Sequence, residues 1–139
     1  MGIDSMFFFE MSNRPYNSEE YASFLGKLFD HFDNHGIEGA YLIMDNVRFH
    51  RTDEVVRLIR SRGHNAVFLP PYSPFLNPIE NAFNQWKAFI KRANAKTEAE
   101  LRLAAENACD NIKQTDCNNY FRHMESYLAR CLSKEIILN

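Results

Sequence analysis

The stretch "AYLIMDNVRFHRTDEVVRLIRSRGHNAVFLP", residues 40–70, carries the clearest pattern of secondary structure in the chain. It begins with a short apolar run at 40–45 and ends with another at 65–70, and turn residues bound both runs, as in buried strands. Between them, Thr52 can cap a helix that ends at Gly63. The buried side of this helix is expected to carry Val55, Val56, Leu58 and Ile59. Strand, helix and strand in this order predict two parallel strands of an α/β layer, each covered on both faces.

The segments before residue 40 predict one strand and one helix. The run "MFFFEM" at 6–11 is aromatic and lies between polar turns, as a strand would. Residues 18–34 predict a helix, which Asn17 can cap with Glu20 as its reciprocal partner. Its apolar residues recur at helical spacing and are Tyr21, Phe24, Leu25, Leu28, Phe29 and Phe32. Up to residue 70 the chain is therefore expected to alternate strictly between strands and helices.

Three more helices are predicted after residue 77. Asn77 can cap the first of them, with Pro78 at its first position. A capping box at 97–100, "TEAE", opens the second, and the third begins at about Asp116. The side chains expected to be buried by the third helix are Tyr120, Phe121, Met124, Tyr127, Leu128 and Cys131. The fold class predicted from this order is α/β with a C-terminal helical tail.

Length and composition narrow the class of protein. With 139 residues the chain is expected to form one domain with a sizeable core. No apolar run approaches the roughly 18 residues that a membrane span needs, and Asp4 lies where a signal peptide would be basic. The three cysteines form no CxxC pair, so we expect mostly buried, reduced thiols of an intracellular protein rather than a zinc site.

The net charge of −2 hides an uneven distribution. Residues 1–45 carry a net charge of −6, residues 46–96 carry +6, and residues 97–139 carry −2. A local basic field attracts phosphates even when the total charge is near zero. The basic side chains of 46–96 are explained equally well as solvated faces of helices.

Two carboxylates occupy positions typical of a functional site. Asp45 ends the strand at 40–45, with Asn46 beside it and His50 five residues further on. Ligands of parallel sheets bind at the carboxyl ends of the strands. Glu80 is the third residue of its predicted helix, where the helix dipole alone already favours an acid. Asp45 could likewise serve only an Asx turn or a helix cap, and His50 could cap or pack beneath the sheet.

The helix that begins at Pro78 carries two parallel stripes of side chains. The core-facing stripe is expected to consist of Ile79, Phe83, Trp86 and Ile90. The polar stripe, one residue later, consists of Glu80, Asn84, Lys87 and Lys91. An acid at a strand end, an acid at a helix start and a basic row suit Mg²⁺ or Mn²⁺ together with a phosphate backbone.

A proline-rich loop, "LPPYSPFLNPIE" at 69–80, leads into Glu80. It can be a simple connector. Together with "LIMDNVRFH" at 42–50, however, it resembles the catalytic core of mariner-type cut-and-paste transposases and their bacterial insertion-sequence relatives. These are DDE enzymes with a ribonuclease-H-like fold. Thirty-four residues lie between Asp45 and Glu80, as in one branch of that family.

The resemblance implies roles for particular residues. Asp45 would be the second and Glu80 the third metal-binding carboxylate of a site that holds two Mg²⁺ or Mn²⁺ ions in the complete family. Asn46, His50, Asn77 and Pro78 would belong to the surroundings of the site. The residues expected to contact DNA are Arg48, Tyr72, Ser73, Lys87 and Lys91. Stiff proline φ angles would limit how far Glu80 moves.

The resemblance also implies what we expect this chain to lack. The family's first aspartate lies on a strand upstream of the equivalent of "MFFFEM". We therefore expect residues 1–95 to be a partial catalytic core without its first two strands, its first aspartate and the N-terminal DNA-binding region. Residues 96–139 would be C-terminal helices of the same domain. The strand that ends at Asp45 would keep an exposed edge, through which the chain could dimerise.

Three functions are compatible with the sequence. The first is a DNA endonuclease and strand transferase domain derived from a transposase, inactive alone for want of the first aspartate and located in a eukaryotic nucleus or a bacterial cytoplasm. The second is a non-enzymatic module of the same origin that binds DNA or protein. The third, an unrelated hydrolase of small phosphate esters, has no Gly-rich phosphate loop in its favour. No membrane partner is expected.

Overall fold

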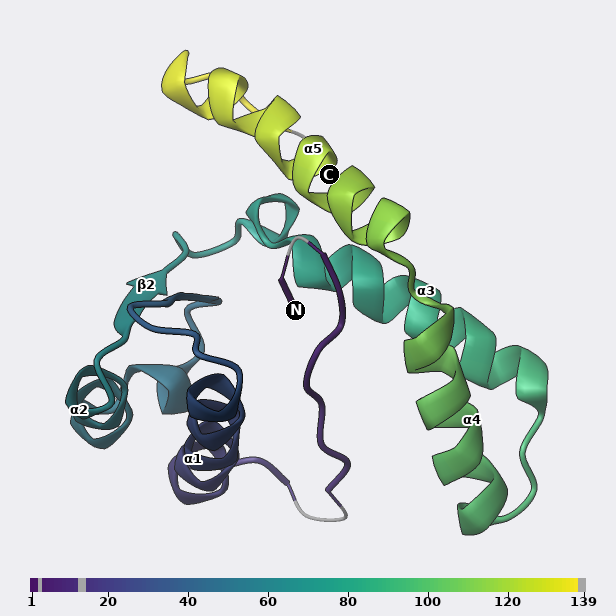
Figure 1. Cartoon of the computed structure of the whole chain (residues 1–139). Coiled ribbons are helices and arrows are strands. Elements are labelled where there is room, and N and C mark those ends of the chain that lie inside the picture. The colour runs from purple at the N-terminus through teal and green to yellow at the C-terminus, as the bar shows by residue number, and fades with distance from the viewer. Residues whose placement is uncertain (3, 13–14, 138–139) are drawn as a thin grey trace. The chain divides into compact units, whose positions relative to one another are not determined.

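The computed structural model describes residues 1–2, 4–12 and 15–137. These fall into two compact units. The first, here called the sheet unit, is Phe8–Ser73, and the second, the helical unit, combines Met1–Phe7 with Pro74–Asn139. The described part of the chain is a mixed α/β structure, mostly helical, with one small sheet (Figure 1).

The sheet consists, among the described residues, of two parallel strands, β1 (Tyr41–Met44) and β2 (Asn65–Phe68). Tyr41 pairs with Asn65, and the register continues without a bulge to the end of both strands. Helix α2 (Asp53–Ser61) connects the strands, as a parallel pair requires. The predicted strand–helix–strand order is therefore confirmed.

One face of this sheet is exposed, which corrects the expectation that both faces are covered. Tyr41 and Ile43 are 71% and 48% exposed, and Val67, in register with Ile43, is exposed as well. Met44 is buried on the opposite face. Alternating exposure of this kind means that the helices of the sheet unit cover one side only.

Local sequence explains where the helices of the sheet unit begin. Helix α1 (Ser18–Asn34) is capped by Asn17, whose side chain accepts a hydrogen bond from the Glu20 N–H at 2.9 Å. Helix α2 is capped by Thr52 in the same way. Both helices bury apolar side chains, which are Leu25, Phe29, Phe32, Val55 and Ile59. Their burial supplies the core of the unit.

A buried histidine ties the starts of the two strands together. His64, between α2 and β2, stacks on Phe29 with 4.8 Å between ring centroids. Its Nδ1 accepts a hydrogen bond from the Ala40 N–H at 3.1 Å, and the Asn65 N–H donates to the Ala40 carbonyl at 2.8 Å. His64 is thus a buried core residue whose Nδ1 has a hydrogen-bond partner.

The predicted strand at 6–11 is not formed. A strand needs a neighbour that binds its backbone N–H and C=O groups, and neither described strand pairs with this segment. Its side chains pack against helices instead. The Phe8 ring lies 5.4 Å from Phe24 of α1, and Met6 packs on the core of the helical unit.

Three helices make up most of the helical unit: α3 (Pro78–Ala93), α4 (Glu98–Asn111) and α5 (Gln114–Leu132). Helices α4 and α5 both pack against α3 (Figure 1). Trp86 of α3 donates from its indole N–H to the Ala105 carbonyl of α4 at 3.0 Å. The predicted capping box of Thr97 and Glu100 is present at the start of α4.

The core of the helical unit is small. Ala82, Ile112 and Cys117 are its buried centre. Cys109 is buried too, and burial raises the pKa of the Cys109 and Cys117 thiols, so both stay protonated near neutral pH. The predicted burial of the cysteines is confirmed for these two, whereas Cys131 is half-buried.

Two predicted apolar stripes in this unit are less buried than expected. Phe83 is 38% exposed, because the side of α3 that faces the other helices is centred on Ala82, one residue earlier. In α5 the expected core residue Leu128 is 44% exposed, and only Cys117 of that helix is fully buried. The described helices include none that is long and apolar enough to cross a membrane.

Candidate functional site

Asp45 directly follows β1, at the carboxyl end of the parallel sheet. Its Oδ1 atom is buried and lies 2.7 Å from Nδ1 of His50. The side chain as a whole is 46% exposed, so the exposed oxygen is Oδ2. Asp45 therefore has one oxygen turned toward the protein and one toward solvent.

His50 lies on η1, a short 3₁₀ helix at Arg48–Arg51 that follows β1. Its Nδ1 hydrogen-bonds the Asp45 carbonyl at 3.3 Å as well as lying beside Oδ1. Of these two contacts only the one with the carbonyl has the geometry of a hydrogen bond, whereas Oδ1 is a close charged neighbour of Nδ1. The sequence-predicted neighbours Asp45 and His50 are thus brought together.

Two aromatic rings hold the His50 ring in place. The Tyr21 ring, from α1, lies 4.3 Å from the His50 ring, and the Phe49 ring meets it edge-on at 4.6 Å. The Tyr21 hydroxyl donates to the Met44 sulfur at 3.1 Å. Burial, and secondarily the negative charge of Asp45, raise the pKa of Tyr21, so its hydroxyl keeps its proton. Sequence reasoning placed Tyr21 only in the core, and no spacing signal linked it to Asp45.

Asn46 and Arg48 also lie beside Asp45 in the chain. The Asn46 Oδ1 atom is buried and has no hydrogen-bond partner among the described residues. Arg48 is exposed and makes no ion pair within the described part of the chain, and the same holds for Arg51, which sequence reasoning passed over. The repeated arginine in "RFHR" was the available signal for Arg51. The turn therefore presents two free cations close in sequence to the carboxylate.

The proline loop contains the division between the units, which falls between Ser73 and Pro74. Tyr72 has a left-handed backbone, with φ of 58°, and a side chain that is 96% exposed. Ser73 is half-buried and donates from its hydroxyl to the Pro71 carbonyl at 3.3 Å. An exposed aromatic residue on a strained backbone is a feature found at binding sites.

Glu80 lies in the first turn of α3, in the helical unit. Its side chain is half-buried and makes no hydrogen bond or ion pair with the described residues. Pro78 is buried at the first position of the helix, as predicted. Asn77 is buried at the N-cap position, but its side chain does not cap: the Glu80 N–H donates to the Asn77 main-chain carbonyl at 3.1 Å.

Lys87 and Lys91 are exposed on α3, as the polar stripe predicts. Neither forms an ion pair within the part of the chain that the structure describes. Arg92, which sequence reasoning did not single out, lies over the Phe89 ring at 5.8 Å. The candidate residues are therefore distributed over both units, with Asp45, Asn46, Arg48 and His50 in the sheet unit and Glu80, Lys87 and Lys91 in the helical unit.

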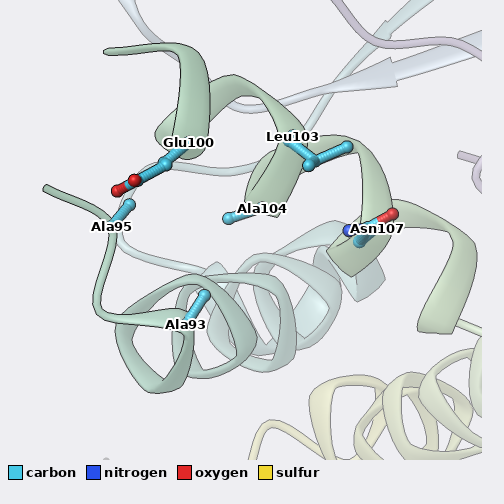
Figure 2. A pocket seen from close by; sticks show the side chains of 6 residues that line it. All are labelled: Ala93, Ala95, Glu100, Leu103, Ala104 and Asn107. Carbon is cyan, nitrogen blue, oxygen red and sulfur yellow. The ribbon is translucent and has the colours of Figure 1, made fainter. Parts of the chain in front are cut away.

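A shallow hollow of about 210 Å³ lies within the helical unit, between the end of α3 and α4. Figure 2 shows that Ala93 and Ala95 line it on one side and Leu103, Ala104 and Asn107 of α4 on the other. Its carboxylate, Glu100, already accepts hydrogen bonds from the Lys96 and Thr97 N–H groups. The carboxylate that lines this hollow is thus already engaged in the cap of α4.

The donor atoms of the candidate residues suit a hard divalent cation. No group of three or more His, Cys, Asp or Glu side chains suited to a metal occurs among the described residues. Mg²⁺, however, needs only one or two carboxylates, since water and phosphate oxygens complete its shell. In the sheet unit such oxygens are the exposed Oδ2 of Asp45 and Oδ1 of Asn46, and in the helical unit the Glu80 carboxylate, which makes no ion pair with the described residues.

Comparison with known proteins identifies the family. Residues 4–102 match the sequence model of a family described as DDE superfamily endonuclease. This match spans both units and includes Asp45 and Glu80. A search among curated proteins found no match.

Proposed function

This chain belongs to the DDE endonuclease superfamily, and on that premise we propose that it is a transposase-derived domain that acts on DNA phosphodiesters with Asp45 and Glu80 as metal-binding carboxylates. The observation that carries the proposal is the state of Asp45. It ends a strand of a parallel sheet, with Oδ1 held inside and Oδ2 open to solvent. The buried Oδ1 has no hydrogen-bond donor among the described residues, and the side chain is open enough for a cation to reach Oδ2.

Mg²⁺ or Mn²⁺ fits the hard oxygen donors of these residues. When bound in such a site, the ions activate the attacking oxygen and stabilise the leaving oxygen of a phosphodiester. Asp45 contributes its exposed Oδ2, and Glu80 contributes a carboxylate that has no competing ion pair within the described chain. Asn46 and His50 surround Asp45, while Asn77 and Pro78 set the start of the helix that carries Glu80.

We assign the chain to the mariner-type branch and to cut-and-paste transposition. Support comes from "LIMDNVRFH" and "LPPYSPFLNPIE" in this order, with 34 residues between Asp45 and Glu80. In this reaction water first attacks a phosphodiester, and the freed DNA 3′-hydroxyl then attacks another. The substrate and target are therefore DNA, namely the ends of a mobile element and its insertion site.

DNA contacts are proposed for Arg48, Lys87 and Lys91, which are exposed and lack ion pairs with described residues. Tyr72 offers an exposed ring for stacking on a base, and Ser73 lies beside it. Phosphate contacts supply affinity without sequence specificity.

The 139-residue chain is proposed to be inactive by itself, because it supplies two of the family's three carboxylates. The two acids near its start are engaged elsewhere. Glu10 forms an ion pair with Lys27 at 2.5 Å, and Asp4 accepts a hydrogen bond from the Gln114 amide at 3.0 Å. Each of these acids therefore already has a partner among the described residues.

Nicking of supercoiled plasmid in Mn²⁺ tests the proposal. The wild-type chain, Asp45→Asn, Glu80→Gln and the control Glu38→Gln are compared, since Glu38 is exposed and lies at the far end of β1 from Asp45. No nicking by any folded variant is expected. If the wild type and Glu38→Gln nick the plasmid and Asp45→Asn and Glu80→Gln do not, the chain is active by itself. This result would contradict the proposed inactivity and support the two carboxylates as metal ligands. Nicking that persists in both variants would contradict the assignment of the carboxylates.

A second candidate is a non-enzymatic DNA-binding module, which the exposed cations Arg48, Lys87 and Lys91 favour. It predicts weak, sequence-independent binding that falls steeply with added salt. Charge reversal at both lysines should weaken this binding, and charge reversal at Lys134, beyond the basic block, should matter less. Binding that is insensitive to salt would count against this candidate.

A further inference from the structure

We propose that His50 is a positioning residue for Asp45: its imidazole holds Oδ1 of the carboxylate inside the sheet unit so that Oδ2 is presented to a metal ion. The inference rests on the proposed function, because it gives His50 a task only if Asp45 binds a metal. It concerns orientation of the carboxylate and requires no change in the charge of either group.

Among the described residues, the polar contacts of the His50 imidazole are both with Asp45. Its Nδ1 lies 2.7 Å from the Asp45 Oδ1 and 3.3 Å from the Asp45 carbonyl oxygen. A histidine that serves only as an apolar filler would not aim one nitrogen at two oxygens. Because both neighbours of Nδ1 are acceptors, this nitrogen carries a proton in the neutral ring.

The ring is held from two sides, so the contact is fixed in space. Tyr21 of α1 lies against one side of the imidazole, and Phe49 of η1 meets it edge-on. These two rings also contact each other, with 5.6 Å between their centroids. The Tyr21 hydroxyl is anchored on the Met44 sulfur, at the last residue of β1. Rotation of His50 away from Asp45 would therefore disturb its packing against Tyr21 of α1 and against Phe49 of η1.

The result is a carboxylate with two unequal oxygens. Oδ1 is buried beside His50, whereas the rest of the carboxylate is open to solvent. Such a group binds a metal ion through one oxygen, which suits Mg²⁺ and Mn²⁺ sites completed by water and phosphate. Polar groups behind a metal ligand commonly set its orientation, and their loss weakens metal binding by about 10- to 100-fold.

Three variants separate positioning from packing. His50→Phe keeps a ring between Tyr21 and Phe49 but removes the nitrogen that faces Asp45. His50→Asn restores an amide donor close to the position of Nδ1. His35→Phe is the matched control, because the His35 Nδ1 contacts a main-chain carbonyl, that of His31 at 2.8 Å, and is exposed away from Asp45.

The measurement is NMR of the isotopically labelled chain during a Mn²⁺ titration, following the broadening of the Asp45 and Asn46 amide signals. We expect His50→Phe to require roughly 10-fold more Mn²⁺ than the wild type. His50→Asn should recover part of this loss, and His35→Phe should match the wild type. Equal Mn²⁺ requirements for His50→Phe and the wild type would overturn the inference.

A second readout does not depend on any variant. At a pH well above the usual titration range of histidine, the nitrogen spectrum of His50 in the wild-type chain should show the tautomer with the proton on Nδ1. The opposite tautomer would overturn the inference.

The Asp45→Asn variant distinguishes failure of the proposed function from failure of the positioning role of His50. If it leaves the broadening intact, the proposed function fails; if it abolishes the broadening while His50→Phe has no effect, only the positioning role fails.

Discussion

Among single residues, Tyr72 combines an unfavourable backbone conformation with an almost fully exposed side chain. A left-handed conformation costs a residue with a Cβ atom about 1–2 kcal/mol relative to glycine. The Tyr72 φ of 58° lies in this region, and its ring is 96% exposed. The ring therefore gains little from packing in the free protein, which favours a role in binding.

Replacing Tyr72 distinguishes the effect of its backbone conformation on stability from the effect of its ring on DNA binding. Tyr72→Gly should change the free energy of unfolding by less than about 1 kcal/mol, because relief of strain offsets the greater freedom of glycine in the unfolded chain. Affinity for single-stranded DNA should fall by about 1–3 kcal/mol through the loss of stacking. Tyr72→Phe should retain the affinity. Denaturant unfolding and a fluorescence binding titration measure both; unchanged affinity in Tyr72→Gly would argue against DNA contact.

Tyr21 links the packing beneath Asp45 to pH. Burial, and then the negative charge of Asp45, raise the pKa of its hydroxyl. The neutral phenol is favoured in the fold, so the stability that it contributes is complete below the usual tyrosine pKa of about 10 and is lost as pH rises toward the folded value. In a spectroscopic titration, Tyr21 should ionise at a higher pH than a tyrosine in a short unfolded peptide. Asp45→Asn should lower the Tyr21 pKa. Ionisation of Tyr21 in the usual tyrosine range in the wild-type chain would contradict this.

At the scale of elements, local sequence was sufficient where the determining contacts are local. The starts of α1, α2 and α4 follow from Asn17, Thr52 and Thr97, because a cap and its N–H partner lie within three residues of each other. Asn77 was predicted to cap by the same rule. Its side chain does not, since the Glu80 N–H binds the Asn77 carbonyl instead.

Elements that depend on distant partners were predicted less well. The segment at 6–11 has the composition of a strand, but no described strand pairs with it. Phe83 and Leu128 lie on apolar stripes, yet whether a stripe is buried depends on which neighbour covers it. For the same reason, the contact of Tyr21 with His50 could not be read from spacing, whereas the proximity of Asp45 and His50 could.

The capping box of α4 gives a prediction at this scale. The Thr97 side chain accepts a hydrogen bond from the Glu100 N–H at 3.2 Å, and the Glu100 carboxylate accepts one from the Thr97 N–H. Thr97→Ala should lower the free energy of unfolding of the helical unit by about 1 kcal/mol, while Thr97→Ser should preserve it. Chemical denaturation followed through Trp86 measures this difference. Equal losses in both variants would mean that the cap is not the cause.

At the scale of the whole molecule, the two candidate carboxylates belong to different units, and the division between the units falls inside the proline loop. Residues 4–102, which match the DDE endonuclease family, include both carboxylates. The resemblance of "LIMDNVRFH" and "LPPYSPFLNPIE" to mariner-type transposases made both of them candidates at the level of the sequence. The division between Ser73 and Pro74 could not be predicted, because it depends on how whole helices pack.

The most direct test of the central claim is binding of Mn²⁺, measured by the relaxation of water protons. The wild-type chain is compared with Asp45→Asn and Glu80→Gln, and with Glu38→Gln and Glu106→Gln, which each remove an exposed carboxylate from the same unit as one candidate. We predict weaker Mn²⁺ binding in Asp45→Asn and in Glu80→Gln and unchanged binding in both controls. Binding that is as strong in Asp45→Asn and Glu80→Gln as in the wild type would contradict it.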